Sequence, residues 1–435
     1  MHTRFLSNNI SSFGSHLLFA GQDTVQLAAK YGTPLYLMDE AKIREQCRTY
    51  QSGMHAAFGS KYRMVYASKA AAFVHMARIM KEENMYLDTV SVGEIATALK
   101  AGFPAERIYF HSNNKTDEDI LYGLRAGVGC WVVDCMEELE SLNRIAYAEH
   151  LRPDILLRLT PGIDPHTFAA VATGKVDSKF GFGIETGYAW EATKRALQCE
   201  NVRLLGFHCH VGSQVFESDV FISAAKIMLD FIAKVKDELG YSASQLDLGG
   251  GFGVRYLPDD PVPDLERYIA EIGHFIAKEC SLLGIEQPVI LLEPGRSIVA
   301  EAGMTLYTVG MVKYIPGLIN YVSVDGGMAD NIRYALYSAP YTVLPATRMD
   351  EPFTERYSVV GRCCESGDII QPNVPLPKTM QRGDLIAVCT TGAYNYSMAS
   401  NYNRLPRPPI VMLKNGESFV AVRGETLDDL LRLDE

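Results

Sequence analysis

Short apolar segments return along the chain at a constant interval, and this rhythm restricts the possible folds more than any single residue. The first four segments begin at Met64, Tyr86, Ile108 and Cys130, each 22 residues after the one before. A strand, a helix and two loops fill such an interval, so the rhythm is typical of repeated βα units.

The same alternation continues through the middle of the chain. We predict strands at Met64–Ala67, Tyr86–Val90, Ile108–Phe110, Cys130–Val133, Ile155–Leu159, Leu204–His208, Gln245–Leu248 and Val289–Glu293. We predict helices at Ala71–Glu83, Val92–Ala101, Asp117–Ala126, Met136–His150, Tyr188–Gln198, Asp219–Leu239 and Asp264–Leu283. Eight strands that alternate with helices favour an α/β fold of the (β/α)8, TIM-type barrel class. A doubly wound open sheet gives the same alternation and remains an alternative.

The pattern changes after Glu293, where short β-rich runs separated by Gly, Pro and Asp replace the alternation. These runs are Met304–Val312, Tyr321–Val324, Tyr357–Val360, Leu385–Val388, Ile410–Leu413 and Ser418–Val422, and we expect no helix among them before Leu427–Leu433. The run Leu35–Met38 is expected to add a strand to the same part. We therefore predict a barrel domain at residues 42–295 and a mainly β, β-barrel-like domain formed by residues 1–41 and 296–435.

The composition excludes several classes of protein. A net charge of −11 argues against a nucleic-acid or anionic-membrane binder, because such proteins need a basic surface. Apolar runs stay well below the ~20 residues that span a bilayer. The nine cysteines are scattered without a Cys-x-x-Cys pair, and residues 1–9 lack the apolar core of a secretory signal. We therefore expect a cytoplasmic protein with reduced thiols.

Polar or glycine residues follow seven of the eight predicted barrel strands. They are Lys69, Asp88, Glu94, His111 to Asn113, Arg158, His208, His210, Ser213, Gly249 to Gly251 and Glu293. Barrel enzymes gather their chemistry at the carboxyl ends of the strands, so these side chains predict one shared site.

Lys69 directly follows an apolar strand, and a lysine in a partly desolvated cleft loses its charge more easily than a solvated one. The neutral amine can form a Schiff base with a carbonyl, and pyridoxal phosphate is the commonest carbonyl cofactor held in this way. Taken alone this reading is weak, because most lysines beside strands are solvated surface residues.

Two further features suit a phosphorylated, planar cofactor. The run Gly249-Gly250-Gly251 lets backbone N–H groups approach a phosphate, to which Ser213 could add a hydroxyl; it lacks the Lys-Ser/Thr pair of a nucleotide P-loop. Glu293 could keep a pyridine nitrogen protonated, or could form a salt bridge with Arg296.

Alternation along a strand would place the rings of His208 and His210 on one face. Three roles for these two histidines remain open. They could be satisfied core histidines, a ring stacked on a cofactor, or metal ligands. We predict no metal, because no further ligands occur at a convincing spacing.

Several motifs in order resemble the alanine-racemase-like (fold type III) pyridoxal-phosphate decarboxylases, and within them the diaminopimelate decarboxylases. The motifs are Tyr66-Ala67-Ser68-Lys69-Ala70, His208-Cys209-His210-Val211-Gly212-Ser213-Gln214, Leu248-Gly249-Gly250-Gly251-Phe252-Gly253, Glu293-Pro294-Gly295-Arg296, Asp325-Gly326-Gly327-Met328, Cys364-Glu365-Ser366-Gly367-Asp368, Gly392-Ala393-Tyr394 and Met398-Ala399-Ser400-Asn401-Tyr402-Asn403. The resemblance covers essentially the whole chain.

The resemblance implies a role for each motif around pyridoxal 5'-phosphate. Lys69 would bind the cofactor covalently, His210 would stack on its ring, and Glu293 would pair with its pyridine nitrogen. The remaining cofactor-binding residues would be Asp88, Ser213, Gly249, Gly250, Gly251, Gly295, Arg296 and Tyr394. Cys364, as proton donor, and Glu365, as contact to a distal ammonium, would come from the second subunit of a homodimer with shared active sites.

The implied small-molecule substrate is meso-2,6-diaminopimelate, converted to L-lysine and CO2 in the last step of lysine biosynthesis. Its distal carboxylate would bind Arg296 and Arg333, with Tyr337 and Tyr394 nearby. The alternatives are a decarboxylase of ornithine, arginine, a D-amino acid or a siderophore precursor, a non-catalytic carrier of pyridoxal phosphate, and a racemase.

Overall fold

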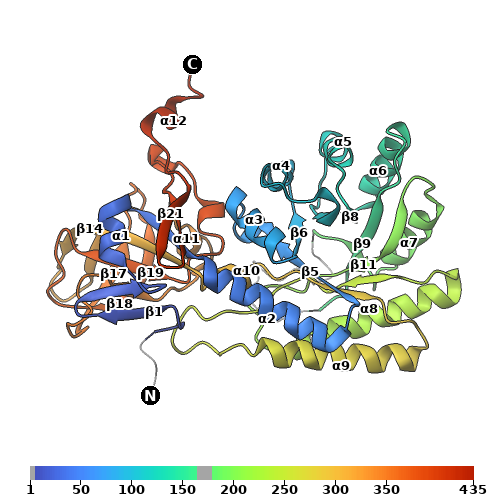
Figure 1. The fold of residues 1–435 in the computed structure, drawn as a ribbon, viewed down its shortest axis with the longest axis horizontal. Coiled ribbons are helices and arrows are strands. Elements are labelled where there is room, and N and C mark those ends of the chain that lie inside the picture. The colour runs from blue at the N-terminus through green and yellow to red at the C-terminus, as the bar shows by residue number, and fades with distance from the viewer. Residues whose placement is uncertain (1–4, 164–178) are drawn as a thin grey trace. The chain divides into compact units, whose positions relative to one another are not determined.

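The computed structural model describes residues 5–163 and 179–435, which form two compact units (Figure 1). The barrel unit comprises Gln46–Gly253 and Pro263–Gly295, and the β unit comprises Met1–Glu45, Val254–Val262 and Arg296–Glu435. Residues Val254–Val262 lie in sequence between the two segments of the barrel unit, so the β unit consists of three separate segments of the chain. The limits of 42 and 295 predicted for the barrel domain remain a prediction.

Eight parallel strands close into a ring in the barrel unit. They are β5 (Tyr62–Ala67), β6 (Tyr86–Thr89), β7 (Ile108–Phe110), β8 (Cys130–Val133), β9 (Asp154–Thr160), β11 (Arg203–His208), β12 (Gln245–Asp247) and β13 (Val289–Leu292). Pairing of β8 with β9 and of β13 with β5 completes the ring. The predicted TIM-type barrel is confirmed, and the doubly wound alternative is wrong.

Helices follow the barrel strands and flank them (Figure 1). They are α3 (Val74–Glu82), α4 (Val92–Lys100), α5 (Asp117–Ala126), α6 (Met136–Ala148), α7 (Tyr188–Gln198), α8 (Ser218–Leu239) and α9 (Leu265–Leu283). Local chemistry sets their ends: Thr116 and Asp119 form a capping box at the start of α5, and Gly127 ends that helix in the left-handed conformation. Helix α3 begins three residues later than predicted, because Ser68–Ala70 form a separate 3-10 turn, η1.

The interior of the barrel is filled by side chains. Val65, Tyr109, Val132, Leu156 and Leu291 are buried together there, and each comes from a different strand. This packing leaves the carboxyl ends of the strands as the place where polar side chains can gather.

The β unit holds a nine-stranded sheet and a small three-stranded one. The large sheet contains β4 (Leu35–Asp39), β14 (Gly303–Lys313), β15 (Asn320–Val324), β16 (Val343–Pro345), β17 (Glu355–Val360), β18 (Ile369–Leu376), β19 (Leu385–Cys389), β20 (Ile410–Lys414) and β21 (Glu417–Val422); the small one contains β1 (Ile10–Phe13), β2 (His16–Phe19) and β3 (Gln22–Asp23). Strand β4 lies between β14 and β20, so the predicted N-terminal strand joins the C-terminal sheet.

Four α-helices and six strands of the described residues were not predicted. The helices are α1 (Thr24–Tyr31), α2 (Glu40–Phe58), α10 (Arg296–Val299) and α11 (Arg333–Tyr337), and the strands are β1, β2, β3, β10 (Phe182–Gly183), β16 and β18. The predicted C-terminal helix is present as α12 (Leu427–Leu431) and ends earlier than expected. The expectation of no helix before Leu427 was wrong, because α10 and α11 are too short to show a 3.6-residue period. Strand β18 was missed because Pro372 and Pro375 argue against a strand.

Among the described residues, no helix is long and apolar enough to cross a membrane.

Candidate active site

Lys69 lies in the η1 turn, immediately after β5 at the carboxyl end of the barrel strands. Its side chain is exposed, so the partly desolvated cleft expected from the sequence is not seen in this single chain. The η1 turn packs closely against Gly295, where an added Cβ would lie 2.9 Å from Cβ of Ala67 and 3.1 Å from Cβ of Ala70. Glycine at position 295 therefore lets the segment after β13 lie against the segment that carries Lys69.

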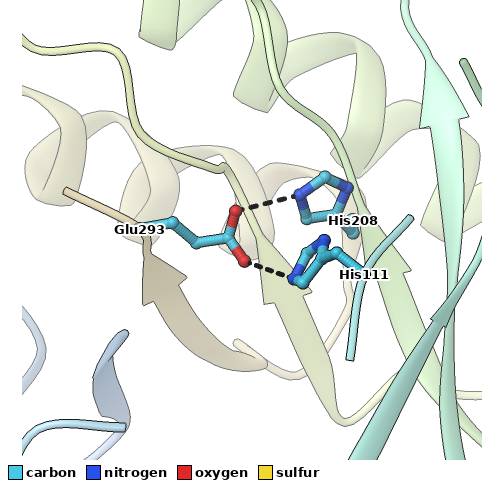
Figure 2. Close-up of side chains that lie close together, drawn as sticks. All are labelled: His111, His208 and Glu293. Carbon is cyan, nitrogen blue, oxygen red and sulfur yellow. Dashed lines mark hydrogen bonds and ion pairs between the residues drawn. The ribbon is translucent and has the colours of Figure 1, made fainter. Parts of the chain in front are cut away.

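Glu293, directly after β13, is held by two histidines from other strands, as Figure 2 shows. His111 follows β7, and its Nε2 lies 2.9 Å from Oε1 of Glu293. His208 ends β11, and its Nε2 lies 3.2 Å from Oε2. The two imidazole rings pack edge to face with centroids 5.0 Å apart. Both carboxylate oxygens therefore face an imidazole nitrogen inside the protein.

The charge of Glu293 follows from these two partners. Burial alone would raise the pKa of this carboxyl, but His111 and His208 outweigh burial and hold the pKa well below its usual range. Burial lowers the pKa of His208 to about 4, so this imidazole is neutral near pH 7. A neutral ring that donates through Nε2 has a bare Nδ1, and Nδ1 of His208 indeed has no hydrogen-bond partner in the structure.

Two other buried carboxyls near this group behave in the opposite way. Burial raises the pKa of Asp247, at the end of β12, well above its usual range, and the negative charge of Glu293 adds to this shift. Burial also raises the pKa of Asp88, on β6, against the effect of His111 at 3.8 Å. Burial therefore opposes the ionisation of Asp88 and Asp247, whereas the two imidazoles favour the ionisation of Glu293.

His210 and the glycine run after β12 form the next part of the site. The Gly250 N–H donates to Nδ1 of His210 at 3.3 Å, so this nitrogen is unprotonated. Burial, together with the positive charges of Lys69 and Arg158, lowers the pKa of His210 well below its usual range. Strand β11 ends at His208, so His208 and His210 do not share a strand face as predicted: one faces Glu293 and the other faces the glycines.

The three glycines are required by their surroundings. Gly249 and Gly251 have φ values of +68° and +117°, which L side chains rarely adopt, and an added Cβ at Gly250 would lie 2.0 Å from the backbone oxygen of Glu293. The loop that carries Ser213 lies alongside, because the Val215 N–H donates to the Gly251 carbonyl at 3.0 Å. The predicted phosphate-binding segments, Gly249 to Gly251 and Ser213, are therefore neighbours.

These residues of the barrel unit fit pyridoxal phosphate. An ionised buried carboxylate suits a protonated pyridine nitrogen, an uncharged imidazole suits a flat ring, and a glycine run suits a phosphate. One ring nitrogen of His111, one of His208 and a carboxylate oxygen of Glu293 also lie within 4.8 Å of one another, a spacing compatible with a metal ion. The predicted absence of a metal remains a prediction.

The β unit contains a cluster of arginine and tyrosine side chains. Arg296 Nη1 donates to the Tyr256 hydroxyl at 2.7 Å, and the Arg296 guanidinium lies 4.7 Å from the centre of the Tyr394 ring. The Arg333 guanidinium lies 5.4 Å from the same ring and 5.9 Å from the ring of Tyr337. The structure therefore brings together four of the five residues predicted to bind substrate or phosphate in the β unit; the fifth, Glu365, lies elsewhere in this unit.

Arg333 is the unusual member of this cluster. It is 6% exposed, its Nε has no hydrogen-bond partner, and no carboxylate among the described residues forms an ion pair with it. A buried guanidinium without an anion is costly, so this site favours an anionic ligand. Tyr394 has φ +66°, an uncommon conformation for a bulky residue that often marks functional sites.

Cys364 and Glu365 lie in an exposed loop of the β unit. Asp368 organises this loop, because its carboxylate accepts hydrogen bonds from the Met328 N–H at 2.6 Å and from the Cys363 N–H at 2.7 Å. The motifs Asp325-Gly326-Gly327-Met328 and Cys364-Glu365-Ser366-Gly367-Asp368 are therefore one local structure, with both predicted dimer-contributed side chains open to solvent.

From the sequence alone, His111 and His208 had no predicted role beside Glu293, and Asp368 was part of a motif without a role of its own. Asp247 and Tyr256 were not identified from the sequence. Asp247 carried a signal, since it directly precedes the glycine run at a strand end. Tyr256 lies in the segment that leaves the barrel unit, which no sequence pattern indicated.

Comparisons with known proteins give the family. Residues 40–300 match the family described as pyridoxal-dependent decarboxylase, pyridoxal binding domain. The chain is 45% identical over 419 residues to diaminopimelate decarboxylase of Bacillus subtilis, covering 96% of this chain and 95% of that protein. It is 46% identical over 409 residues to the protein of the same name from Bacillus methanolicus, covering 94% of each.

Solved structures of diaminopimelate decarboxylases are also similar to this chain. The crystal structure of diaminopimelate decarboxylase from M. jannaschii matches with a TM-score of 0.92 and 33% identity over 98% of both chains. The same protein in complex with L-lysine matches with a TM-score of 0.90. A lysine/ornithine decarboxylase from Vibrio vulnificus, complexed with putrescine, is 26% identical with a TM-score of 0.76 over 91% of this chain and 98% of that one. The chain therefore belongs to the pyridoxal-dependent decarboxylases, in the diaminopimelate decarboxylase family.

Proposed function

We propose that this chain is a carboxy-lyase that converts meso-2,6-diaminopimelate to L-lysine and CO2 with pyridoxal 5'-phosphate as cofactor. The observation that carries the proposal is the ionised, buried Glu293 at the mouth of a closed barrel, beside the glycine run and the turn that bears Lys69. As an enzyme of amino-acid biosynthesis it would act in the cytoplasm.

Different residues of the barrel unit bind different parts of the cofactor. When bound, the cofactor supplies a conjugated ring that accepts the electron pair left behind as CO2 departs. The Lys69 amine holds it covalently, and the Glu293 carboxylate keeps a proton on its pyridine nitrogen. His210 covers one ring face, while Ser213 and the backbone of Gly249 to Gly251 hold the phosphate. The other proposed cofactor-binding residues are Asp88 and Gly295 of the barrel unit and Arg296 and Tyr394 of the β unit.

The substrate proposal rests on charge. The α-carboxylate of the substrate is the group that leaves, so a second carboxylate needs its own cation. Arg333 has no partner anion among the described residues and, with Arg296, Tyr337 and Tyr394, would bind the distal carboxylate. A diamine precursor such as ornithine would leave this guanidinium unpaired, which disfavours the first alternative substrate.

A second copy of the chain would supply the residue that donates the proton to the product and the residue that binds the distal ammonium of the substrate. In the proposed homodimer, Cys364 delivers a proton to the substrate Cα after CO2 leaves, and Glu365 binds the distal ammonium. The exposure of both side chains supports this arrangement.

The first experiment measures CO2 and L-lysine from the holoenzyme with meso-diaminopimelate, with L-ornithine, L-lysine and L-arginine in parallel. Release of CO2 from diaminopimelate alone is expected. Release from another amino acid instead would keep the cofactor chemistry but overturn the substrate. A lack of CO2 from any substrate, with cofactor still bound, would favour the carrier or the racemase.

Lys69→Ala tests the cofactor attachment. The variant is expected to lose the covalent, borohydride-reducible link to the cofactor and nearly all turnover. Near-normal turnover would contradict the proposed role of Lys69.

Mixing two inactive variants tests the shared site. Lys69→Ala and Cys364→Ala are each expected to be impaired, and mixed dimers would regain up to about a quarter of wild-type activity, because half of the dimers would hold one intact site. Normal turnover by Cys364→Ala alone would remove the proton-donor role, and no recovery on mixing would contradict shared sites.

A further inference from the structure

Glu293 is held from two sides by side chains that belong to other strands of the barrel (Figure 2). His111 follows β7, His208 ends β11 and Glu293 follows β13, and all three are at least nine-tenths buried. Because each group sits at the end of a strand in a closed ring, the barrel fixes the backbone positions from which the three side chains meet. The two contacts then orient the carboxylate, one at each oxygen.

The atoms that meet in the two contacts show how each histidine interacts with the Glu293 carboxylate. Both imidazoles approach the carboxylate through Nε2, at 2.9 and 3.2 Å, and each reaches a different oxygen. In the part of the chain that the structure describes, Nδ1 of His208 has no hydrogen-bond partner, so the proton of a neutral His208 is on the nitrogen that faces Glu293. His208 forms a hydrogen bond with Oε2, whereas the His111 contact with Oε1 is a close approach outside hydrogen-bond geometry. Both contacts favour the ionised form of the buried carboxylate.

We propose that His111 and His208 are positioning residues, whose Nε2 atoms face the two oxygens of Glu293 and hold this carboxylate ionised and aimed, and which thereby determine how firmly the pyridine nitrogen of the bound cofactor keeps its proton. This inference rests on the proposed cofactor chemistry. It concerns residues that need not touch the cofactor, and it does not depend on which amino acid is the substrate.

Other titratable groups face the same cluster and must be kept constant in any test. They are Asp88 on β6, Glu94 in α4, Arg158 on β9, Cys209 and His210 after β11, Asp247 on β12 and Lys69 in η1. Substituting one histidine at a time leaves all of them in place.

The experiment compares Gln, Asn and Leu at position 208, and separately at position 111. The glutamine side-chain nitrogen occupies nearly the place of a histidine Nε2, whereas the asparagine nitrogen corresponds to Nδ1 and is too short to reach Glu293. Two readouts that need no substrate are the affinity for pyridoxal phosphate and the pH dependence of the absorption spectrum of the bound cofactor. Turnover with meso-diaminopimelate is measured as a third.

We expect the Gln variants to resemble wild type. The Asn and Leu variants should show a bound-cofactor spectrum that titrates at a lower pH than in wild type, and kcat reduced by about 10- to 100-fold, the effect of losing a hydrogen bond to a charged group. Cofactor affinity and substrate KM should change by less than about threefold. His274→Leu, at an exposed histidine of α9, is the matched control and should behave as wild type.

Three outcomes would overturn the inference. Wild-type spectra in the Asn and Leu variants would show that the contacts do not matter. Equal impairment of the Gln and Asn variants would show that only the shape of the ring matters. Loss of cofactor binding in all three variants would indicate a purely structural role. If the Leu variants do not fold, the comparison of the Gln and Asn variants still tests whether Nε2 of each histidine is needed. If the substrate proposal fails, the spectra still report on Glu293.

Discussion

Each unit buries one carboxylate of special interest, and the two respond to burial in opposite ways. Glu293 in the barrel unit faces two imidazoles, which hold its pKa well below the usual range. Asp330 in the β unit accepts hydrogen bonds from the Tyr307 hydroxyl and from the Gly327 N–H at 3.0 Å, but burial still raises its pKa to about 7, and the charges of Asp368 and Asp325 add to this.

The difference shows that hydrogen bonds alone do not settle the charge of a buried carboxylate. Asp330 has two hydrogen-bond donors and Glu293 has one, from His208, with Nε2 of His111 2.9 Å from its other oxygen. The difference lies in the neighbours, because Glu293 faces two imidazoles whereas Asp330 has two acidic neighbours. The first arrangement suits chemistry that needs a fixed negative charge. The second suits a structural role, since Asp330 ties β14 to the turn at Gly327.

Glu293→Gln should have the largest effect. The variant keeps the size of the side chain but removes the negative charge, so we expect kcat to fall by about 10²- to 10³-fold. Asp330→Asn is the matched variant in the other unit, and should reduce kcat much less. Steady-state kinetics at saturating cofactor measures both. Equal losses in the two variants would mean that Glu293 has no special role.

Asp330→Asn should change how stability depends on pH. The folded pKa of about 7 lies above the usual 3.8, so the folded protein holds a proton that the unfolded chain has released. Wild type therefore loses up to about 4 kcal/mol from this group as pH rises from 4 to 8, and the variant does not. Chemical unfolding of both proteins at several pH values measures the difference. A constant difference across this range would contradict the shift.

His208→Gln should give the opposite slope in the barrel unit. The folded pKa of about 4 lies below the usual 6.5, so the unfolded chain binds a proton first. Wild type should lose up to about 3 kcal/mol of stability as pH falls from 6.5 to 4, whereas a glutamine cannot titrate. The same unfolding series tests this, and parallel wild-type and variant curves would count against a neutral, buried His208.

Arg333→Met should have the smallest effect, and on binding rather than on chemistry. Methionine fills much of the same space without charge, so we expect KM for meso-diaminopimelate to rise by about 10- to 100-fold with kcat changed less. Cofactor affinity provides the control and should stay close to wild type. An unchanged KM would remove Arg333 from the substrate site and reopen the choice of amino acid.

Much of the barrel could be predicted because its signals are local. The strands that begin at Tyr86, Ile108 and Cys130 start where the apolar rhythm places them, since each needs only a short buried run between turns. Helix α2 could also have been predicted, because Ile43, Cys47, Tyr50 and Met54 are buried at helical spacing. Strand β18, with two prolines, could not.

The sequence by itself determined the alternation of strands and helices, the motifs at the strand ends and the residue types that suit pyridoxal phosphate. These are properties of neighbouring residues, and short-range sterics and periodicity are enough to reveal them. Only the tertiary structure decided that His111 and His208 contact Glu293, that His210 turns to the glycines instead, and that Arg333 has no partner anion within residues 5–163 and 179–435. Those facts depend on side chains far apart in the chain, and closing the ring of strands is what brings them together.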